Sequence, residues 1–443
     1  MKHIVILGNG IAGITAARHI RKRSDHKITV VSGETEHFFS RTALMYIYMG
    51  HMKYENTKPY EDWFWSKNKI DLKQGWVQNV DFDEKSLIFD NGETLSYDQL
   101  ILSTGSASNK FGWKGQDLNG VQGLYSYQDL ELMETNSKGI SRAVIIGGGL
   151  IGVEMAEMLH SRNIPVTYLI REKNFWDIVL PINESKLIDR HLLENHIDLR
   201  LETEMDEILD DGNGHVHGIK TKSGEIIDCQ FVGLTVGVHP NIDFLKGTKL
   251  ELDRGILVDE FLQTNIEDVY AIGDCVQLKN PESHRRPIEA VWYAGRMMGE
   301  TLARTIVDQK TAYKPGIWFN SAKFFDIEYQ TYGNVPAKLN EGESSFYWEH
   351  EDGKKCIHIV YETDALKVKG VNLFGIRQSH EIWDKWLKKG EKLKYVIQHL
   401  EEAYFDPEFF TRYEAAIQAL YNEQFPKDLV SPRRKGLLEK ILS

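Results

Sequence analysis

GGGLIGVE at residues 147–154 repeats a pattern that already stands near the start of the chain, GNGIAG at residues 8–13. Each copy follows a short apolar run, HIVIL at 3–7 and AVII at 143–146, and opens a helical pattern. In a G-x-G-x-x-G turn, the first glycine makes the strand-to-helix turn, the second lets a pyrophosphate approach the backbone, and the third packs helix on strand. The N–H groups of the helix N-terminus can then bind phosphates. Two copies in one chain predict two dinucleotide-binding βαβ units.

The segments around these two turns predict the remaining architecture. The first βαβ unit occupies residues 1–32 and the second occupies residues 142–170. Residues 76–104 alternate in short strands, which is typical of a small sheet inserted between helices of an α/β domain. Beyond about residue 318 the composition becomes aromatic and mixed in charge, with strands followed by helices.

Composition narrows the classes of protein that the chain can be. The 443 residues are 42% hydrophobic and 27% charged, as in globular proteins of several domains. A net charge of −12 argues against nucleic-acid binding, which needs a basic face. No apolar run approaches the roughly 18 residues of a membrane span, and the chain begins directly with a strand, which leaves no room for a signal peptide.

The cysteines and histidines suggest neither disulfides nor a metal. Cys229, Cys275 and Cys356 are distant in sequence and form no CxxC pattern, which indicates a reducing compartment. We therefore expect a cytoplasmic protein. His215 and His217 would share one face of a strand, but no third ligand stands nearby, so we expect no metal site.

Besides the two glycine turns, three further motifs stand along the chain. They are STG at 103–105, GVHPN at 237–241 and DVYAIGD at 268–274. Together with the two glycine turns, and over roughly residues 1–320, they make the chain resemble the two-dinucleotide-binding-domain flavoproteins of the pyridine nucleotide-disulfide reductase superfamily. The resemblance implies an α/β fold with two Rossmann-like domains, one for FAD and one for NADH or NADPH, and a C-terminal α+β interface domain with a helical extension.

This resemblance also implies the domain boundaries. The FAD-binding domain would be discontinuous, and the nucleotide domain would interrupt it. The implied ranges are 1–122 with 252–318 for FAD, 123–251 for NAD(P)H, and 319–443 for the interface domain and its tail.

The contacts to the cofactors follow from the same resemblance. Asp274 would bind the ribityl or phosphate region of FAD, and the helix that begins near Glu289 would direct its N-terminus at the flavin C2 carbonyl, where charge accumulates on reduction. The implied FAD contacts are Gly8, Gly10, Ile11, Ala12, Gly13, Glu34, Arg41, Thr104, Gly105, Gly273 and Asp274. The implied NAD(P)H contacts are Gly147, Gly149, Leu150, Ile151, Gly152, Arg171 and Gly237.

In dinucleotide-binding units, an acidic residue about 20 positions beyond the third glycine normally binds the ribose hydroxyls. In the first unit Glu34 stands two residues beyond the usual acid position, and we favour ribose binding over an exposed loop acid. In the second unit Ile170 fills that position and Arg171 follows, and an arginine suits a 2′-phosphate by charge and by its fork of donors. Glu172 and the third glycine, Gly152, favour NADH instead. We expect NADPH, with a solvated loop as the alternative.

FFSRT at residues 38–42 decides the subclass. Disulfide-reducing relatives carry a redox cysteine in this stretch, and Arg41 stands where it would be. The resemblance is therefore to relatives without that thiol, such as rubredoxin and ferredoxin reductases and the flavin portion of assimilatory nitrite reductases. A glutamate beside the flavin in relatives matches Glu154, but Met45 and Tyr46 stand where its lysine partner would be. Glu154 and Arg41, the nearest cation, are the candidate catalytic residues, although Glu154 could instead be an acid near the N-terminus of its helix.

We expect an FAD-dependent NAD(P)H oxidoreductase that passes hydride to the flavin and then single electrons to an iron–sulfur protein of the rubredoxin or ferredoxin type. One alternative is an NAD(P)H oxidase or quinone-type reductase. Another is a redox-sensing interaction protein that binds FAD and nucleotide, which the missing lysine favours. The final segment, SPRRKGLLEKILS at 431–443, could be a solvated helix end, a strap on the second subunit of a homodimer, or a docking element for a partner or a membrane surface.

Overall fold

The structure of the protein is a computed structural model that describes residues 1–282, 285–405 and 411–431. Its contacts divide the chain into two compact units. The first unit contains residues 1–171 and 203–315, and the second contains residues 172–202 and 316–443. Nearly all of the segment expected to form a strap or docking element, 431–443, lies outside the described residues.

A parallel five-stranded sheet is the first layer of unit 1, with the strand order β19-β7-β1-β2-β3. Its strands are β1 (His3–Leu7), β2 (Lys27–Ser32), β3 (Ile70–Gln74), β7 (Gln99–Leu102) and β19 (Val269–Ala271). The four strands other than β3 are largely apolar and buried, as is typical of a parallel sheet covered on both faces, whereas the edge strand β3 buries only Ile70. Because β1 has neighbours on both sides that come later in the chain, a crevice for a ligand is expected at its carboxyl end.

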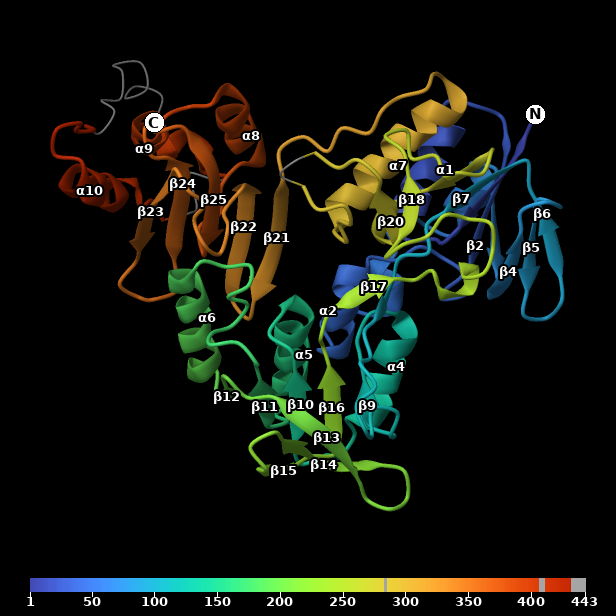
Figure 1. The fold of residues 1–443 in the computed structure, drawn as a ribbon, viewed down its shortest axis with the longest axis horizontal. Helices are drawn as coiled ribbons and strands as arrows, with labels where there is room; N and C mark the ends of the chain where they lie inside the picture. The colour runs from blue at the N-terminus through green and yellow to red at the C-terminus, as the bar shows by residue number, and fades with distance from the viewer. Residues whose placement is uncertain (283–284, 406–410, 432–443) are drawn as a thin grey trace. The chain divides into compact units, whose positions relative to one another are not determined.

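Two long helices of this layer, α1 (Ile11–Arg21) and α7 (Trp292–Val307), cross closely (Figure 1). A Cβ at Gly299 of α7 would lie 2.6 Å from the carbonyl oxygen of Ala12, so this crossing requires a glycine. Both β19 and α7 come from the stretch after the second glycine turn. The first layer is therefore built from two separate parts of the chain.

The second parallel layer of unit 1 contains β11, β10, β16 and β9 in that order. Its elements are β9 (Val121–Gln122), α4 (Tyr127–Asn136), β10 (Ala143–Ile146), α5 (Leu150–Ser161), β11 (Val166–Leu169) and β16 (Phe231–Leu234). Helix α5 follows β10 and packs on β10, β11 and β16. Both predicted βαβ units are therefore present, and the α/β fold class is confirmed.

Short elements complete unit 1. The antiparallel three-stranded sheets are β4 (Val77–Asp81), β5 (Ser86–Phe89) and β6 (Thr94–Ser96), and β13 (Met205–Asp210), β14 (Val216–Thr221) and β15 (Ile226–Asp228). The two-stranded pairs are β8 (Ser106–Ser108) with β17 (Val238–Pro240), and β18 (Ile256–Val258) with β20 (Val276–Leu278). The short helices are η1 (Arg41–Ala43), α2 (Leu44–Tyr48), η2 (Tyr54–Thr57), α3 (Trp63–Lys67), η3 (Asp243–Leu245) and η4 (Gly273–Cys275).

Unit 2 is built on an antiparallel five-stranded sheet with the order β21-β22-β25-β24-β23. Its elements are α6 (Ile182–Glu194), β12 (Asp198–Arg200), β21 (Phe319–Phe324), β22 (Ile327–Gly333), β23 (Glu343–Glu349), β24 (Cys356–Glu362), β25 (Val368–Phe374), α8 (His380–Lys389), α9 (Leu393–Gln398), η5 (Leu400–Ala403) and α10 (Glu414–Gln424). Side chains of the sheet and of α8, α9, η5 and α10 share one hydrophobic core. This is the α+β part that the sequence predicted.

A buried polar contact joins α6 to that sheet. Glu184 of α6 is fully buried, and its carboxylate lies 2.8 Å from Nδ1 of His358 and accepts a hydrogen bond of 2.7 Å from Asn372. Burial raises the pKa of Glu184, while its contacts with His358 and Asn372 oppose that rise. Residues 172–202 therefore group with the C-terminal unit, although the predicted nucleotide domain, 123–251, includes them. The three-domain division stays a prediction.

In the described part of the chain, no helix combines the length and the apolar character that a membrane crossing requires. Among the same residues, no group of three or more histidine, cysteine, aspartate or glutamate side chains is placed to hold a metal ion.

Candidate functional site

In the first glycine turn, between β1 and α1, two glycines pack closely against other residues and one borders open space. Gly8 has a φ of 117°, and a Cβ there would lie 2.1 Å from the carbonyl oxygen of Ser103. A Cβ at Gly13 would lie 2.2 Å from the oxygen of Gly8. At Gly10, by contrast, a Cβ would meet nothing within 4 Å. Packing therefore explains Gly8 and Gly13, whereas the space at Gly10 is room for a ligand next to the backbone.

The second glycine turn, between β10 and α5, likewise has two closely packed glycines and one that borders open space. Gly147 has a φ of 115°, and its Cβ would lie 2.5 Å from the oxygen of Thr235. A Cβ at Gly152 would lie 2.2 Å from the hydroxyl of Tyr168, and one at Gly149 would meet nothing within 4 Å. The open glycine is again the residue that caps the helix N-terminus, where backbone N–H groups are available to phosphates.

The first residues of both helices lie beside these open glycines. The predicted contacts Ile11 and Ala12 begin α1, and Leu150 and Ile151 begin α5. The two turns therefore present two equivalent anion sites, each at the carboxyl end of a parallel strand. This arrangement fits the pyrophosphate of a dinucleotide at each turn.

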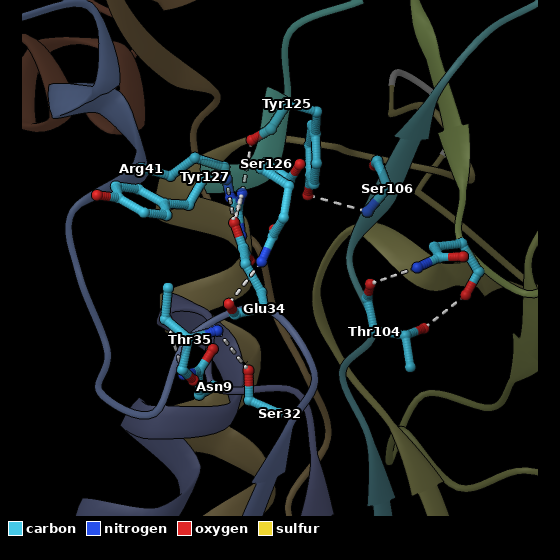
Figure 2. Close-up of polar contacts among 12 residues, drawn as sticks. Asn9, Ser32, Glu34, Thr35, Arg41, Thr104, Ser106, Tyr125, Ser126 and Tyr127 are labelled. Atoms are coloured by element: carbon cyan, nitrogen blue, oxygen red, sulfur yellow. Dashed lines mark hydrogen bonds and ion pairs between the residues drawn. The ribbon is translucent and has the colours of Figure 1, made fainter. Parts of the chain in front are cut away.

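Hydrogen bonds from polar side chains, none of them among the predicted cofactor contacts, stabilise the two turns. Asn9 is buried and donates a hydrogen bond of 2.8 Å to the carbonyl of Thr35 (Figure 2). The hydroxyl of Ser103 donates to the carbonyls of Leu7 and Gly8, both at 3.0 Å. These contacts join the glycine turn to the ends of β2 and β7.

The second turn has its own pair of supporting hydroxyls. Tyr168 donates to the carbonyl of Gly147 at 2.9 Å, and Thr235 donates to that of Ile146 at 2.9 Å. Complete burial raises the pKa of the Tyr168 hydroxyl, which therefore stays protonated as a donor.

Arg41 lies in η1, and its guanidinium is fixed by hydrogen bonds. It binds Glu34 through two parallel hydrogen bonds of 2.7 and 2.6 Å, and it donates to the carbonyl of Tyr125 at 2.6 Å (Figure 2). The guanidinium also lies 4.5 Å from the centre of the Tyr125 ring. Burial lowers the pKa of Arg41, but the hydrogen bonds to Glu34 outweigh this effect, so the pKa lies above the ordinary arginine value. The structure therefore brings Arg41 and Glu34 together as a charged pair.

Glu34 has a further partner, because one of its oxygens accepts a hydrogen bond of 2.8 Å from the backbone N–H of Tyr127. The carboxylate is thus held between the end of β2 and the start of α4. Its role in binding a ribose stays a prediction.

Glu154 lies in α5, beyond the second glycine turn, and is half-buried. Helix α2, which carries Met45 and Tyr46 where relatives have the lysine, packs against α5. Met45 is buried, and the ring of Tyr46 stacks on that of His51. The pairing of Glu154 with a cation stays a prediction.

Asp274 lies in η4 and accepts hydrogen bonds of 3.2 Å from the hydroxyls of Ser106 and Tyr125. Burial raises the pKa of Asp274, whereas these two donors and the charge of Arg41 lower it. A Cβ at Gly273 would lie 3.0 Å from that of Ala12, which brings η4 against the first turn of α1. Asp274 therefore stands close to the first glycine turn, and its contact with FAD stays a prediction.

Tyr125 connects these groups, and no sequence motif indicated it. Its hydroxyl donates to Asp274 and accepts a hydrogen bond of 2.9 Å from the N–H of Ser106, and its ring lies under Arg41. The two partners of its hydroxyl lie 19 and 149 residues away, so no local pattern in the sequence could indicate them.

The STG motif ends where β8 begins, and the GVHPN motif contains β17, the strand that pairs with β8. Thr104 donates a hydrogen bond of 2.8 Å to the carbonyl of Asn241, and the N–H of Asn241 donates to the carbonyl of Gly105 at 2.9 Å. Gly237 has a φ of 91°, which favours glycine. The two motifs thus link the first and second parallel layers.

At the end of β11 the usual acid position is filled by a buried apolar residue. Ile170 is fully buried, and its side chain lies 2.9 Å from where a Cβ on Gly148 would be. Arg171, the next residue, is exposed. The edge of the second site therefore presents a cation and no acid from these two positions.

All three thiols lie in the interior. Cys229, Cys275 and Cys356 are buried and form no disulfide. Burial raises the pKa of Cys229 to about 12 and that of Cys275 to about 11, so both are protonated at neutral pH. Protonated, buried thiols are poor nucleophiles and poor redox relays.

Comparison with known proteins agrees with this geometry. The family model described as pyridine nucleotide-disulphide oxidoreductase matches residues 2–299. Nitrite reductase [NAD(P)H] of Bacillus subtilis is 30% identical over 280 residues, which are 62% of this chain and 34% of that protein. NADH-rubredoxin oxidoreductase of Clostridium acetobutylicum is 29% identical over 284 residues, 63% of this chain and 69% of that protein.

Among solved structures, a NAD-dependent persulfide reductase from A. fulgidus has a TM-score of 0.82 at 22% identity, covering 96% of this chain and 84% of that one. The chain spans about a third of the length of the two Bacillus subtilis relatives that it matches, 34% and 36%. The resemblance drawn from the five motifs is confirmed. The chain belongs to the pyridine nucleotide-disulphide oxidoreductase family.

Proposed function

We propose that the protein is an FAD-dependent NAD(P)H:acceptor oxidoreductase that delivers electrons to a small iron–sulfur protein of the rubredoxin or ferredoxin type. The observation that carries this proposal is Arg41. It occupies the place of the redox cysteine, and its guanidinium is bound by Glu34 and Tyr125. With the three thiols buried, electrons would have to leave the flavin without a thiol relay.

The residues of unit 1 fit the two cofactors that the family supports. Gly10 and the N-terminus of α1 would receive the FAD pyrophosphate, and Asp274 would bind a hydroxyl of the same cofactor. Gly149 and the N-terminus of α5 would receive the nicotinamide nucleotide. Bound FAD supplies the chemistry: it accepts two electrons as a hydride and can release them one at a time.

Glu154 is the proposed acid beside the flavin, and Arg41 is the proposed cation of the site. Because the pKa of Arg41 lies above the ordinary arginine value, this cation is charged at every physiological pH. Its hydrogen bonds to Glu34 keep it in one orientation, so it would act as a fixed positive charge and not as a proton donor.

NADPH is the proposed nucleotide. Ile170 offers no carboxylate to a ribose hydroxyl, and the exposed Arg171 suits a 2′-phosphate by charge and geometry. The glycine at 152, which would otherwise favour NADH, is explained by the Tyr168 hydroxyl 2.2 Å from its Cβ position.

The relative named NADH-rubredoxin oxidoreductase supports the iron–sulfur acceptor. The free thiols support a reducing compartment such as the cytoplasm. A homodimer is the assembly that we propose, with unit 2 as its contact surface.

An NAD(P)H oxidase or quinone-type reductase is the second candidate. A flavin that lacks a thiol relay could also pass electrons directly to oxygen or to a quinone. Met45 and Tyr46 at the lysine position remove one positive charge near the flavin, which would slow hydride transfer in either candidate and favours the redox-sensing interaction protein instead.

The test is an anaerobic titration of the purified protein with NADPH and, separately, with NADH. The absorbance of the flavin band at about 450 nm is followed. Acceptors are then added one at a time: rubredoxin, ferredoxin, a quinone and oxygen. Rapid bleaching by NADPH followed by fast reoxidation with an iron–sulfur protein supports the proposal. Fast reoxidation only by oxygen or quinone would favour the second candidate, and failure to bleach would refute both.

A further inference from the structure

Three neighbouring strands of the first parallel layer end at the same edge, and each is followed by a different chemical group. The open Gly10 follows β1, Gly33 and Glu34 follow β2, and Gly75 and Trp76 follow β3. The N–H of Gly75 donates a hydrogen bond of 2.9 Å to the carbonyl of Ser32, which holds the last two of these groups side by side.

The indole of Trp76 lies against the backbone of Gly33. A Cβ on Gly33 would lie 2.3 Å from Cδ2 of the indole and 2.5 Å from Cε3. The φ of Gly33 lies outside the left-handed region, so its backbone conformation does not require a glycine. The missing side chain at residue 33 is instead what allows the indole to lie at this place.

Trp76 is nevertheless 56% exposed, whereas Trp65, in the same unit, is 3% exposed. One part of the indole packs on the Gly33 backbone, and much of the rest faces solvent. A large apolar ring in this position gains little stability from burial. Its exposed surface is therefore available to a flat ligand at the carboxyl edge of the sheet.

We propose that Trp76 stacks on the adenine ring of FAD. A dinucleotide whose pyrophosphate lies at the turn after β1 places its adenosine ribose at the end of β2. The adenine then extends toward the end of β3, where Trp76 stands. Aromatic side chains bind bases by stacking, because every base has a flat π face. This inference rests on the proposed FAD site and adds to it a residue that selects for the adenine half.

The test measures binding of FAD and of FMN to the apoprotein of the full-length chain, in the wild type and in Trp76→Ala. Trp63→Ala is the matched control, because Trp63 is 58% exposed in the same unit. We expect Trp76→Ala to weaken FAD binding by about 5- to 150-fold, the range that loss of stacking on one base gives. Binding of FMN, which has no adenine, should be unchanged, and Trp63→Ala should bind FAD like the wild type.

Trp76→Phe and tryptophan fluorescence provide an independent readout. Trp76→Phe should keep most of the FAD affinity because it keeps an aromatic ring, and ADP should quench the fluorescence of the wild type more than that of Trp76→Phe. Wild-type FAD affinity in Trp76→Ala, or an equal loss of FMN and FAD binding, would overturn the inference and leave the FAD site standing. If the wild-type apoprotein binds no FAD, the proposed function fails as well.

Discussion

Substituting the second glycine of the first turn should remove cofactor binding and leave the fold intact. In Gly10→Ala the added methyl group meets nothing within 4 Å, and the φ of −69° at Gly10 suits an alanine. Alanine lowers the entropy of the unfolded chain but is a poorer helix N-cap than glycine, so the free energy of unfolding should change by no more than about 1 kcal/mol. The same methyl group would stand in the path of the pyrophosphate, so FAD affinity should fall by about tenfold or more, which corresponds to about 1.4 kcal/mol.

Gly13→Ala is the matched comparison, because its methyl group meets the chain itself. It would lie 2.2 Å from the oxygen of Gly8 and 2.6 Å from the hydroxyl of Ser103. Such overpacking costs about 1–3 kcal/mol or more. We therefore expect Gly13→Ala to lower the unfolding midpoint of the apoprotein in urea, and Gly10→Ala to leave that midpoint nearly unchanged. Urea unfolding and FAD binding of both apoproteins measure this. A stable Gly10→Ala that binds FAD like the wild type would show that the pyrophosphate does not lie against Gly10.

Three further predictions concern charged residues. Because burial raises the pKa of Asp274, its carboxylate opposes folding at pH values above its ordinary range. In calorimetry, Asp274→Asn should therefore raise the melting temperature of the apoprotein at pH 7, and this gain should disappear as the pH falls below about 4. In a titration with FAD, the same variant should bind the cofactor more weakly. Glu184→Ala leaves His358 and Asn372 buried without their partner and should cost about 3–5 kcal/mol in unfolding experiments; a loss below about 1 kcal/mol would contradict the importance of this contact. Arg171→Ala should raise the KM for NADPH by about tenfold without changing that for NADH, since it removes a charge-assisted hydrogen bond of at least about 1.5 kcal/mol, and equal effects on both nucleotides in steady-state assays would argue against the 2′-phosphate contact.

The parts of the site that could be predicted from the sequence depend on short-range geometry. In a G-x-G-x-x-G turn, each of the three glycines has its own structural role, and all three lie within six residues. The motif alone therefore indicated Gly10 and Gly149 as the glycines that leave room for a ligand. Asp274 was predicted through the resemblance of its motif, DVYAIGD, to the family, and the structure shows that this motif carries β19 and η4 together.

Contacts between distant residues could not be predicted. Tyr125 reaches Asp274 across 149 positions, and Asn9 reaches Thr35 across 26. Arg41 and Glu34 were both identified, but their seven-residue spacing in an irregular loop gave no sign that they form a pair. The packing of Trp76 on Gly33 could not be predicted for the same reason, since Gly33 follows a neighbouring strand.

The assignment of residues 172–202 to unit 2 also depends on a distant contact. These residues follow the second βαβ unit in the chain, so sequence order places them in the nucleotide domain. The hydrogen bond between Glu184 and His358 spans 174 positions and buries both side chains. Buried ionisable groups are found paired because an unpaired one is costly, but the sequence alone does not show which groups pair.

Whether electrons leave the flavin without a thiol relay is tested most sharply by the number of NADPH equivalents that fully reduce the anaerobic protein. A flavin without a redox-active thiol partner takes up two electrons, so one equivalent of NADPH per bound FAD should complete the bleaching near about 450 nm. An enzyme with a redox-active disulfide takes up four electrons. A requirement for two equivalents of NADPH per FAD would show that a thiol relay exists, and it would rule out the proposed electron path without a redox-active thiol.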